Sequence, residues 1–416
     1  MIYLVKQKLS SPFIRNMSWL GGSQLFTRIA RLLTVIILGR LLQPYEYGLA
    51  AVVLMTYEFV EVFTRNGIEA KLVQADKEDL DEFCQTGYWL NWIIFGSLFI
   101  IQFIAAFPVA WFYKDAQLIL PICVLASIYL ILPFSLVQAA LIQRENRLHI
   151  IAVIDGLQNL VASILSIILA FSGLGMWALV LPRVIVAPIW VVGCYIYHKW
   201  RPCKVFTLYR WREIISFSQS ILGVELLKTL RNNLDYLLVG YFIGIASLGT
   251  YYFAFNAGLV LTLSVANAID SALFPHLCNA RSDPKQFRYR YFNSLKTIAV
   301  IVIPIVLLQS ILAPIYVPIV YGHKWIPAIP ILILICLSGI PRPFANAASL
   351  GMWTLDKPHW DLVWNIVFTG IFALAIVIGT YWNILGVAAA VLLIHLTALP
   401  LYTLKVTQYV LKRTVY

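Results

Sequence analysis

Charged side chains are scarce in this 416-residue sequence. Only 12% of its residues are charged and 61% are hydrophobic, with a mean hydropathy of +0.82. An average soluble domain carries about 25% charged residues, so this composition excludes an ordinary soluble protein. Acidic residues are the scarcer sign, with 19 Asp and Glu against 31 Lys and Arg. The sequence therefore predicts an integral membrane protein with a surplus of basic residues.

Residue patterns for chemistry are also missing. The six cysteines are scattered without CxxC spacing, which predicts neither a disulfide nor a metal site. The sequence has no glycine-rich phosphate loop, no nucleophile elbow and no zinc-ligand spacing, so we expect no enzyme and no cofactor. The N-terminal region has no small-residue cleavage site after a short apolar segment, which predicts an anchor rather than a signal peptide.

Long apolar segments recur along the whole chain. Each is near the length of about 20 residues that a helix needs to cross the hydrocarbon core of a bilayer. We therefore predict an all-α protein with about twelve transmembrane helices. The predicted spans are 17–40, 46–64, 87–112, 117–141, 150–171, 175–197, 216–242, 246–273, 294–316, 325–345, 361–380 and 384–406.

The formal charge of +12 would suit a partner such as nucleic acid, but its distribution argues against one. Most lysines and arginines, Arg342 among them, are predicted to lie on one side of the membrane with both termini. Only Arg40, Lys114 and Lys324 are predicted to lie on the other side. Basic loops mark the cytoplasmic side, so we expect cytoplasmic termini, contacts with membrane lipids and no nucleic-acid partner.

The sequence contains a faint internal repeat. TRIARLLTVIILGRLLQPYEYG (27–48) aligns without a gap with KTLRNNLDYLLVGYFIGIASLG (228–249), placing Gly39 on Gly240 and Gly48 on Gly249. Chance similarity between apolar helices is the alternative. Six spans per repeat predict two parallel six-helix bundles with a central cavity near the membrane midplane. The predicted domains are an N-terminal bundle (1–197), a cytoplasmic linker (198–215) and a C-terminal bundle (216–416).

Several charged residues fall inside the predicted spans, where an arginine costs about 2.5–3.5 kcal/mol near the bilayer centre. Arg28 and Arg31 share one face of the first helix, which carries no acid, so they need a partner from elsewhere, either Glu58 and Glu61 or a ligand. We predict that cations line the cavity and bind an anion such as a pyrophosphate, because the guanidinium group suits phosphate oxygens. The predicted cationic residues are Arg28, Arg31, Arg183, Lys228 and Arg231.

A structural explanation stays open for part of this set, because ion pairs within one helix would neutralise the charges. Such pairs are Arg231 with Asp235, Glu61 with Arg65, and Glu225 with Lys228. We assign gating or counter-ion roles to Glu58, Glu61, Asn232 and Asp235. His395 is predicted either to pack with a hydrogen bond or to relay protons.

The chain resembles the polysaccharide transporter branch, or Wzx-like oligosaccharide flippases, of the multidrug/oligosaccharidyl-lipid/polysaccharide (MOP) flippase superfamily. The resemblance covers nearly the full length. It is carried by LGRLLQPYEYGLAAV (38–52), GMWALV (175–180), NNLDYLLVGYFIG (232–244), LGTYYFAF (248–255), YGHKW (321–325) and WNILGVAAA (382–390).

This resemblance implies a MATE-like fold in a bacterial inner membrane. It also implies an undecaprenyl-diphosphate-linked oligosaccharide as substrate, flipped from the inner to the outer leaflet, with polysaccharide polymerase machinery as a partner. One alternative is a multidrug exporter of the same superfamily, which would need an acidic cavity for cationic drugs. A membrane-embedded polymerase or ligase is a second alternative, but it would be expected to have a longer outer loop.

Overall fold

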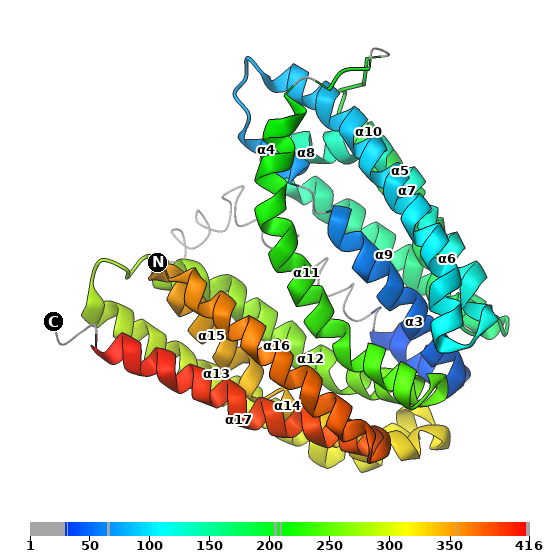
Figure 1. Ribbon diagram of the computed structural model, residues 1–416, viewed down its shortest axis with the longest axis vertical. Helices are drawn as coiled ribbons and strands as arrows, with labels where there is room; N and C mark the ends of the chain where they lie inside the picture. The colour runs from blue at the N-terminus through cyan, green and yellow to red at the C-terminus, as the bar shows by residue number, and fades with distance from the viewer. Residues whose placement is uncertain are drawn as a thin grey trace, which may run out of the picture. The chain divides into compact units, whose positions relative to one another are not determined.

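The computed structural model describes residues 30, 32–64, 67–203, 206–208, 210–355 and 357–412, and they fold into helices joined by short turns (Figure 1). The predicted all-α class is confirmed. The chain divides into two compact units, Met1–Leu230 and Arg231–Tyr416, so that helix α11 (Trp211–Phe242) contributes to both. The predicted domain bounds, with a linker over 198–215, stay a prediction.

The first unit contains long helices and one interrupted span. Its elements are α3 (Pro44–Glu61), η1 (Val62–Thr64), α4 (Ile68–Gln74), α5 (Leu80–Tyr113), η2 (Ala116–Leu118), α6 (Ile119–Ala126), α7 (Ile128–Ile131), η3 (Leu132–Phe134), α8 (Leu136–Arg144), α9 (Leu148–Phe171) and α10 (Trp177–Tyr197). The segment predicted as one helix over 117–141 is thus several short ones. Proline in η3 explains part of this break, because it cannot donate a backbone hydrogen bond.

The second unit follows a similar plan. Its elements after α11 are α12 (Ile245–Cys278), α13 (Pro284–Tyr316), the π-helical turn η4 (Val317–Tyr321), η5 (His323–Ala328), α14 (Ile329–Ser338), α15 (Pro341–Thr354), α16 (Pro358–Thr380) and α17 (Asn383–Lys412). Helices α16 and α17 pack against each other along their length (Figure 1). Helix α12 bends by 45° between Ile245–Leu259 and Thr262–Cys278.

Local sequence signals explain where several helices begin. The carboxylate of Asp283 accepts hydrogen bonds from the backbone of Lys285 and Gln286, and Pro284 occupies the first position of α13. Helix α3 also has proline at its first position, and there the Glu46 carboxylate accepts a hydrogen bond from the backbone N–H of Gln43, the residue before the helix, at 2.7 Å.

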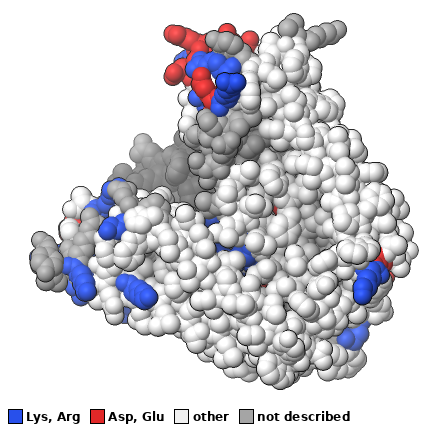
Figure 2. Space-filling view, in the orientation of Figure 1, with Lys and Arg blue, Asp and Glu red and all other residues white. Residues whose placement is uncertain are grey.

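Nine helical segments in the described part of the chain are long and apolar enough to span a membrane, or ten if bent α12 counts as one span. Most of the predicted first span lies outside the described residues, and α11 is not among these segments. The total of about twelve spans therefore stays a prediction. Figure 2 shows that charged side chains gather mainly near helix ends and that the visible helix sides are largely uncharged.

The structure corrects the predicted position of Arg342. The span predicted to end at residue 345 continues as α15 to Thr354, within one 32-residue apolar segment that begins at His323. Arg342 therefore lies inside a candidate span, partly buried, rather than in a cytoplasmic loop. The Pro341–Arg342–Pro343 sequence looks like the end of a helix, yet prolines are tolerated in the first turn of a helix, which is where they stand.

Aromatic stacking joins two of the sequence stretches that carry the resemblance. The ring of Phe253 in α12 lies 3.7 Å from that of Trp325 in η5, and 4.9 Å from that of Tyr321. Trp325 and Phe253 are almost completely buried. LGTYYFAF and YGHKW therefore form one part of the core of the second unit.

Candidate functional site

Arg183 is one of two predicted cationic residues of the first unit that the structure describes, the other being Lys228 near the end of that unit. Arg183 lies about 9 Å from the N-terminal end of α10, a helix that is a candidate membrane span. Its side chain is exposed, and its guanidinium makes no hydrogen bond or ion pair with any residue that the structure describes. An exposed cation at this depth requires water, a polar cavity or an anion to face, because lipid does not solvate it.

Acidic and aromatic groups of α3 lie close to Arg183. The charged groups of Glu61 and Arg183 both lie near enough to the Tyr57 hydroxyl to act on it. The ring of Tyr57 stacks on Tyr129 with centroids 5.5 Å apart. Glu58 and Glu61 are both partly buried. The counter-ion role predicted for Glu58 and Glu61 is therefore compatible with their surroundings and stays a prediction.

Arg28 and Arg31, on which the sequence argument depends most, lie outside the described residues. Arg65, the predicted partner of Glu61, lies outside them as well.

Helix α11 contains an ion pair that the sequence analysis considered. Lys228 Nζ lies 2.9 Å from Glu225 Oε1, so the i, i+3 pair is formed. The Lys228 side chain is nevertheless 44% exposed, whereas that of Glu225 is 19% exposed. An exposed ammonium group keeps donors for another partner, because lysine has three N–H bonds.

The ion pair between Arg231 and Asp235, which was the structural alternative, does not form. Asp235 accepts the Tyr251 hydroxyl of α12 at 2.8 Å and its own helix's Tyr236 N–H at 3.0 Å. Arg231 instead donates to the side-chain oxygen of Asn365 in α16. The i, i+4 spacing permits a pair, but α12 and α16 offer each side chain a different partner. Asn232, the remaining polar residue of this turn, is exposed.

Arg342 is a cation that the sequence analysis missed as a site residue. Its charge acts on Asp235 and Tyr251, and its guanidinium lies 5.7 Å from the ring centroid of Phe255. Its Nε atom is buried and has no hydrogen-bond partner among the described residues. The charge of Asp235 thus acts on Arg342, although the described residues show no direct ion pair between them. A cation inside the apolar segment 323–354 could have signalled that Arg342 belongs to the site.

Asp361, also missed, is the centre of a buried hydrogen-bond network in the same unit. It accepts the Ser349 hydroxyl at 2.6 Å, the Trp353 indole N–H at 3.0 Å and the Tyr402 hydroxyl at 3.0 Å. Its backbone oxygen accepts the Asn365 amide at 2.7 Å. This network connects α15, α16 and α17.

His395 is a buried residue of α17. One ring nitrogen, Nδ1, lies 2.7 Å from the Val391 carbonyl, and the ring packs edge-on against Phe368 and Phe372. These contacts are those of a packed, hydrogen-bonded histidine. The proton-relay role stays a prediction.

The fold of this chain is that of MOP superfamily transporters. It is similar to the lipid II flippase MurJ in an inward closed conformation, with a TM-score of 0.73, 14% identity and coverage of 95% of this chain and 90% of that one. It is also similar to an inward-facing multidrug resistance MATE family transporter, with a TM-score of 0.71, 16% identity and coverage of 94% and 96%. The predicted fold class is confirmed.

Relatives identify the family within this class. Residues 37–330 match the family described as polysaccharide biosynthesis protein, and the chain belongs to it. The chain is 26% identical to the Escherichia coli lipopolysaccharide biosynthesis protein WzxC, covering 88% of this chain and 75% of that protein. It is 24% identical to the Bacillus subtilis teichuronic acid biosynthesis protein TuaB, with 85% and 73% covered. It is therefore a multi-pass membrane protein of a polysaccharide biosynthesis family, with the fold of MOP superfamily transporters.

Proposed function

We propose that this protein flips an undecaprenyl-diphosphate-linked oligosaccharide from the cytoplasmic to the outer leaflet of a bacterial inner membrane. The single observation that carries the proposal is the exposed Arg183 within the apolar helix α10. A guanidinium group can bind two phosphate oxygens at once, and a diphosphate is the group that such a lipid must bring into the membrane region.

The proposed mechanism is alternating access. The cations bind the diphosphate with different affinities in the inward- and outward-open states, because only a differential affinity can shift a conformational equilibrium. The glycan crosses through a hydrated passage while the lipid chain stays in the bilayer. Arg28, Arg31, Arg183, Lys228 and Arg231 are the proposed cations, and Arg342 is added to them.

Orientation and partners complete the proposal. We infer that both termini are cytoplasmic, because basic residues concentrate in the connections on that side and such a bias sets orientation. A polysaccharide polymerase would receive the flipped lipid at the outer leaflet. The finding that supports this step is the similarity to named polysaccharide biosynthesis proteins, such as the Rhizobium meliloti succinoglycan biosynthesis transport protein ExoT, 25% identical over 333 residues.

Complementation of a flippase-deficient strain tests the proposal. Arg183→Ala should abolish polysaccharide export at normal membrane insertion, and Arg183→Lys should retain part of it because charge survives without the bidentate geometry. Arg28→Ala and Arg31→Ala should act like Arg183→Ala. Arg212→Ala, at the exposed start of α11, is the matched control and should export normally. Full export by all three alanine variants would refute the anion-binding assignment.

The same fold also occurs in multidrug exporters, so the alternative function needs its own readout. A drug exporter should protect cells from cationic drugs and should lose that activity when Glu58 or Glu61 is neutralised. We expect no such protection, because a cavity lined by arginines repels cations.

A further inference from the structure

A groove lies between the C-terminal half of α10 and η3 in the first unit. Its volume is about 640 Å³, within the range of about 300–1,000 Å³ that is usual for small-molecule sites. It is lined by Phe134, Val191, Val192, Tyr195, Ile196 and Arg201. The lining is thus apolar except for the Tyr195 hydroxyl and the single cation.

The interrupted span explains one wall of this groove. Phe134 ends η3, where the segment from Ala116 to Arg144 breaks, and its ring is held edge-on by Trp92 of α5 at 4.9 Å. The opposite wall is α10, which contacts η3. On that helix Val192 and Ile196 are 55% and 71% exposed. Val192 lies nine residues, or about two and a half turns, after Arg183 and therefore on the opposite face of α10. Because α10 is a candidate membrane span, we infer that this opposite face meets acyl chains.

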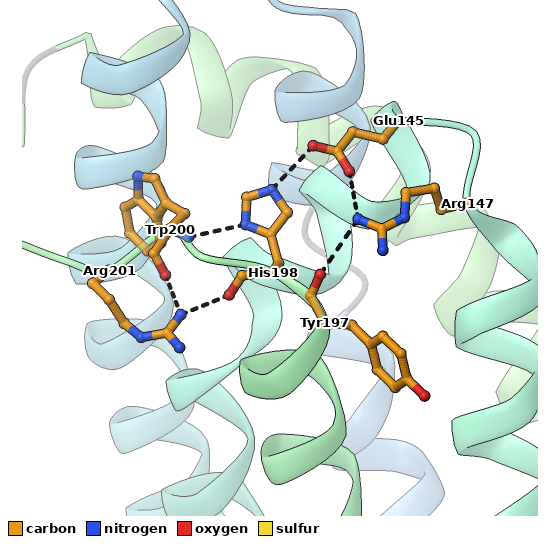
Figure 3. Close-up of polar contacts among 6 residues, drawn as sticks. All are labelled: Glu145, Arg147, Tyr197, His198, Trp200 and Arg201. Atoms are coloured by element: carbon orange, nitrogen blue, oxygen red, sulfur yellow. Dashed lines mark hydrogen bonds and ion pairs between the residues drawn. The ribbon is translucent and has the colours of Figure 1, made fainter.

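Arg201 stands at the end of the groove, just after α10 (Figure 3). Its guanidinium donates to the carbonyl oxygens of Tyr195, His198 and Trp200 at 2.9, 2.7 and 2.6 Å, and it lies 4.3 Å from the Tyr195 ring centroid. These bonds fix the group at the helix C-terminus, where a cation is favourable. They use three of the five guanidinium N–H bonds, so two remain for an anion.

The neighbouring acid is already neutralised. The Glu145 carboxylate lies 3.0 Å from Arg147 Nη1 and 3.3 Å from His198 Nε2 (Figure 3). The hydrogen bond from Arg147, and then the contact with His198, hold the pKa of the Glu145 carboxyl below its usual range. The exposed Lys199 adds a second cation beside Arg201. A second acid, Asp81, accepts the Trp200 indole N–H at 3.4 Å, so the three cations Arg147, Lys199 and Arg201 outnumber the two acids at this end of the groove.

We propose that this groove is a binding site for one anionic phospholipid. Its phosphate accepts hydrogen bonds from Arg201, and an acyl chain lies along Val192, Ile196 and Phe134. The chemistry fits a membrane lipid because the groove opens to the bilayer along its apolar length and ends at a cation. Basic sites of this kind at the ends of spanning helices select anionic head groups. Tyr197, 45% exposed, and Trp200 are residue types that favour the headgroup level.

Native mass spectrometry of the full-length detergent-purified protein tests this site. Phosphatidylglycerol, phosphatidylcholine and undecaprenyl phosphate are titrated separately. Val192→Trp fills the groove without changing a buried position, and its matched control is Val300→Trp on α13, where Val300 is 66% exposed. Arg201→Gln removes the cation, and Arg201→Lys restores the charge.

One phosphatidylglycerol should bind the wild type and Val300→Trp about tenfold more tightly than phosphatidylcholine, a modest value for a charge-assisted contact. Val192→Trp should lose this tight lipid, Arg201→Gln should lose the preference for it, and Arg201→Lys should recover much of that preference. Equal phosphatidylglycerol binding by the wild type and Val192→Trp would overturn the proposal, even if Arg201→Gln failed to fold. A tenfold preference for undecaprenyl phosphate over phosphatidylglycerol in this groove would also overturn it.

Discussion

Removing the Asp361 carboxylate should lower the stability of the second unit, because three side chains donate hydrogen bonds to it. In Asp361→Ala, the Ser349 hydroxyl can turn to the Tyr402 oxygen, which lies 3.4 Å away. The Trp353 indole N–H loses its acceptor, and the network around Tyr402 loses its charged member. A donor that loses its acceptor away from water costs about 1–3 kcal/mol, and the 40% exposed Trp353 belongs at the lower end of this range. We therefore expect Asp361→Ala to lower the free energy of unfolding by about 2–4 kcal/mol in total.

Asp361→Asn separates shape from charge at the same position. The amide oxygen of the asparagine can accept one or two of the three hydrogen bonds. Its amino group is itself a donor and faces other donors, so we expect the free energy of unfolding to fall by about 1–2 kcal/mol. The control is Asp76→Ala, which removes an exposed carboxylate from a turn and should change stability by less than about 0.5 kcal/mol.

Thermal unfolding in detergent, followed by the fraction of monodisperse protein after heating, gives the comparison. Unfolding of such proteins is commonly irreversible, so the rank order of the midpoints is the observable. The expected order is wild type and Asp76→Ala highest, Asp361→Asn lower and Asp361→Ala lowest. If Asp361→Ala melts together with Asp76→Ala, the network around Asp361 does not stabilise the unit, and the reasoning is wrong.

Two further predictions concern packing and charge. Gly386→Ala should lower the melting midpoint, because an added Cβ would clash with the Gly379 carbonyl oxygen. Its control is Gly370→Ala, where an added Cβ meets nothing within 4 Å, and this variant should keep the wild-type midpoint. Lys228→Ala should reduce export while Glu225→Ala should not, if the 44% exposed ammonium serves the substrate. Equal effects of these two variants on stability, with export unchanged, would instead assign the pair to helix stabilisation worth about 0.2–0.5 kcal/mol.

Much of the helical organisation could be read from local sequence. Apolar length located the helices, because each span must satisfy its backbone hydrogen bonds internally once it leaves water. The predicted spans 150–171 and 361–380 fall on α9 and α16 almost end to end. The sequence did not show the break within 116–144 or the continuation of α15 to Thr354. The reason is that a proline that breaks an apolar segment cannot be told by sequence from one in the first turn of a helix.

The site was predicted less completely. Helical spacing placed Arg231 and Asp235 on one face of α11. It could not show that Arg231 would donate to Asn365 and that Asp235 would accept from Tyr251. Arg342 looked like a loop residue because its position depends on α14 and α15 continuing as one membrane-spanning segment.

The amino-acid sequence by itself determined that this chain enters a membrane and where most of its helices form. These properties depend on composition and on spacing within single helices, because each residue contributes its own free energy of transfer from water into the membrane. Only the tertiary structure decided which charges are neutralised and which stay exposed, as Arg183 does. That outcome depends on how each helix is rotated against its neighbours, and the partners come from helices that are distant in the sequence.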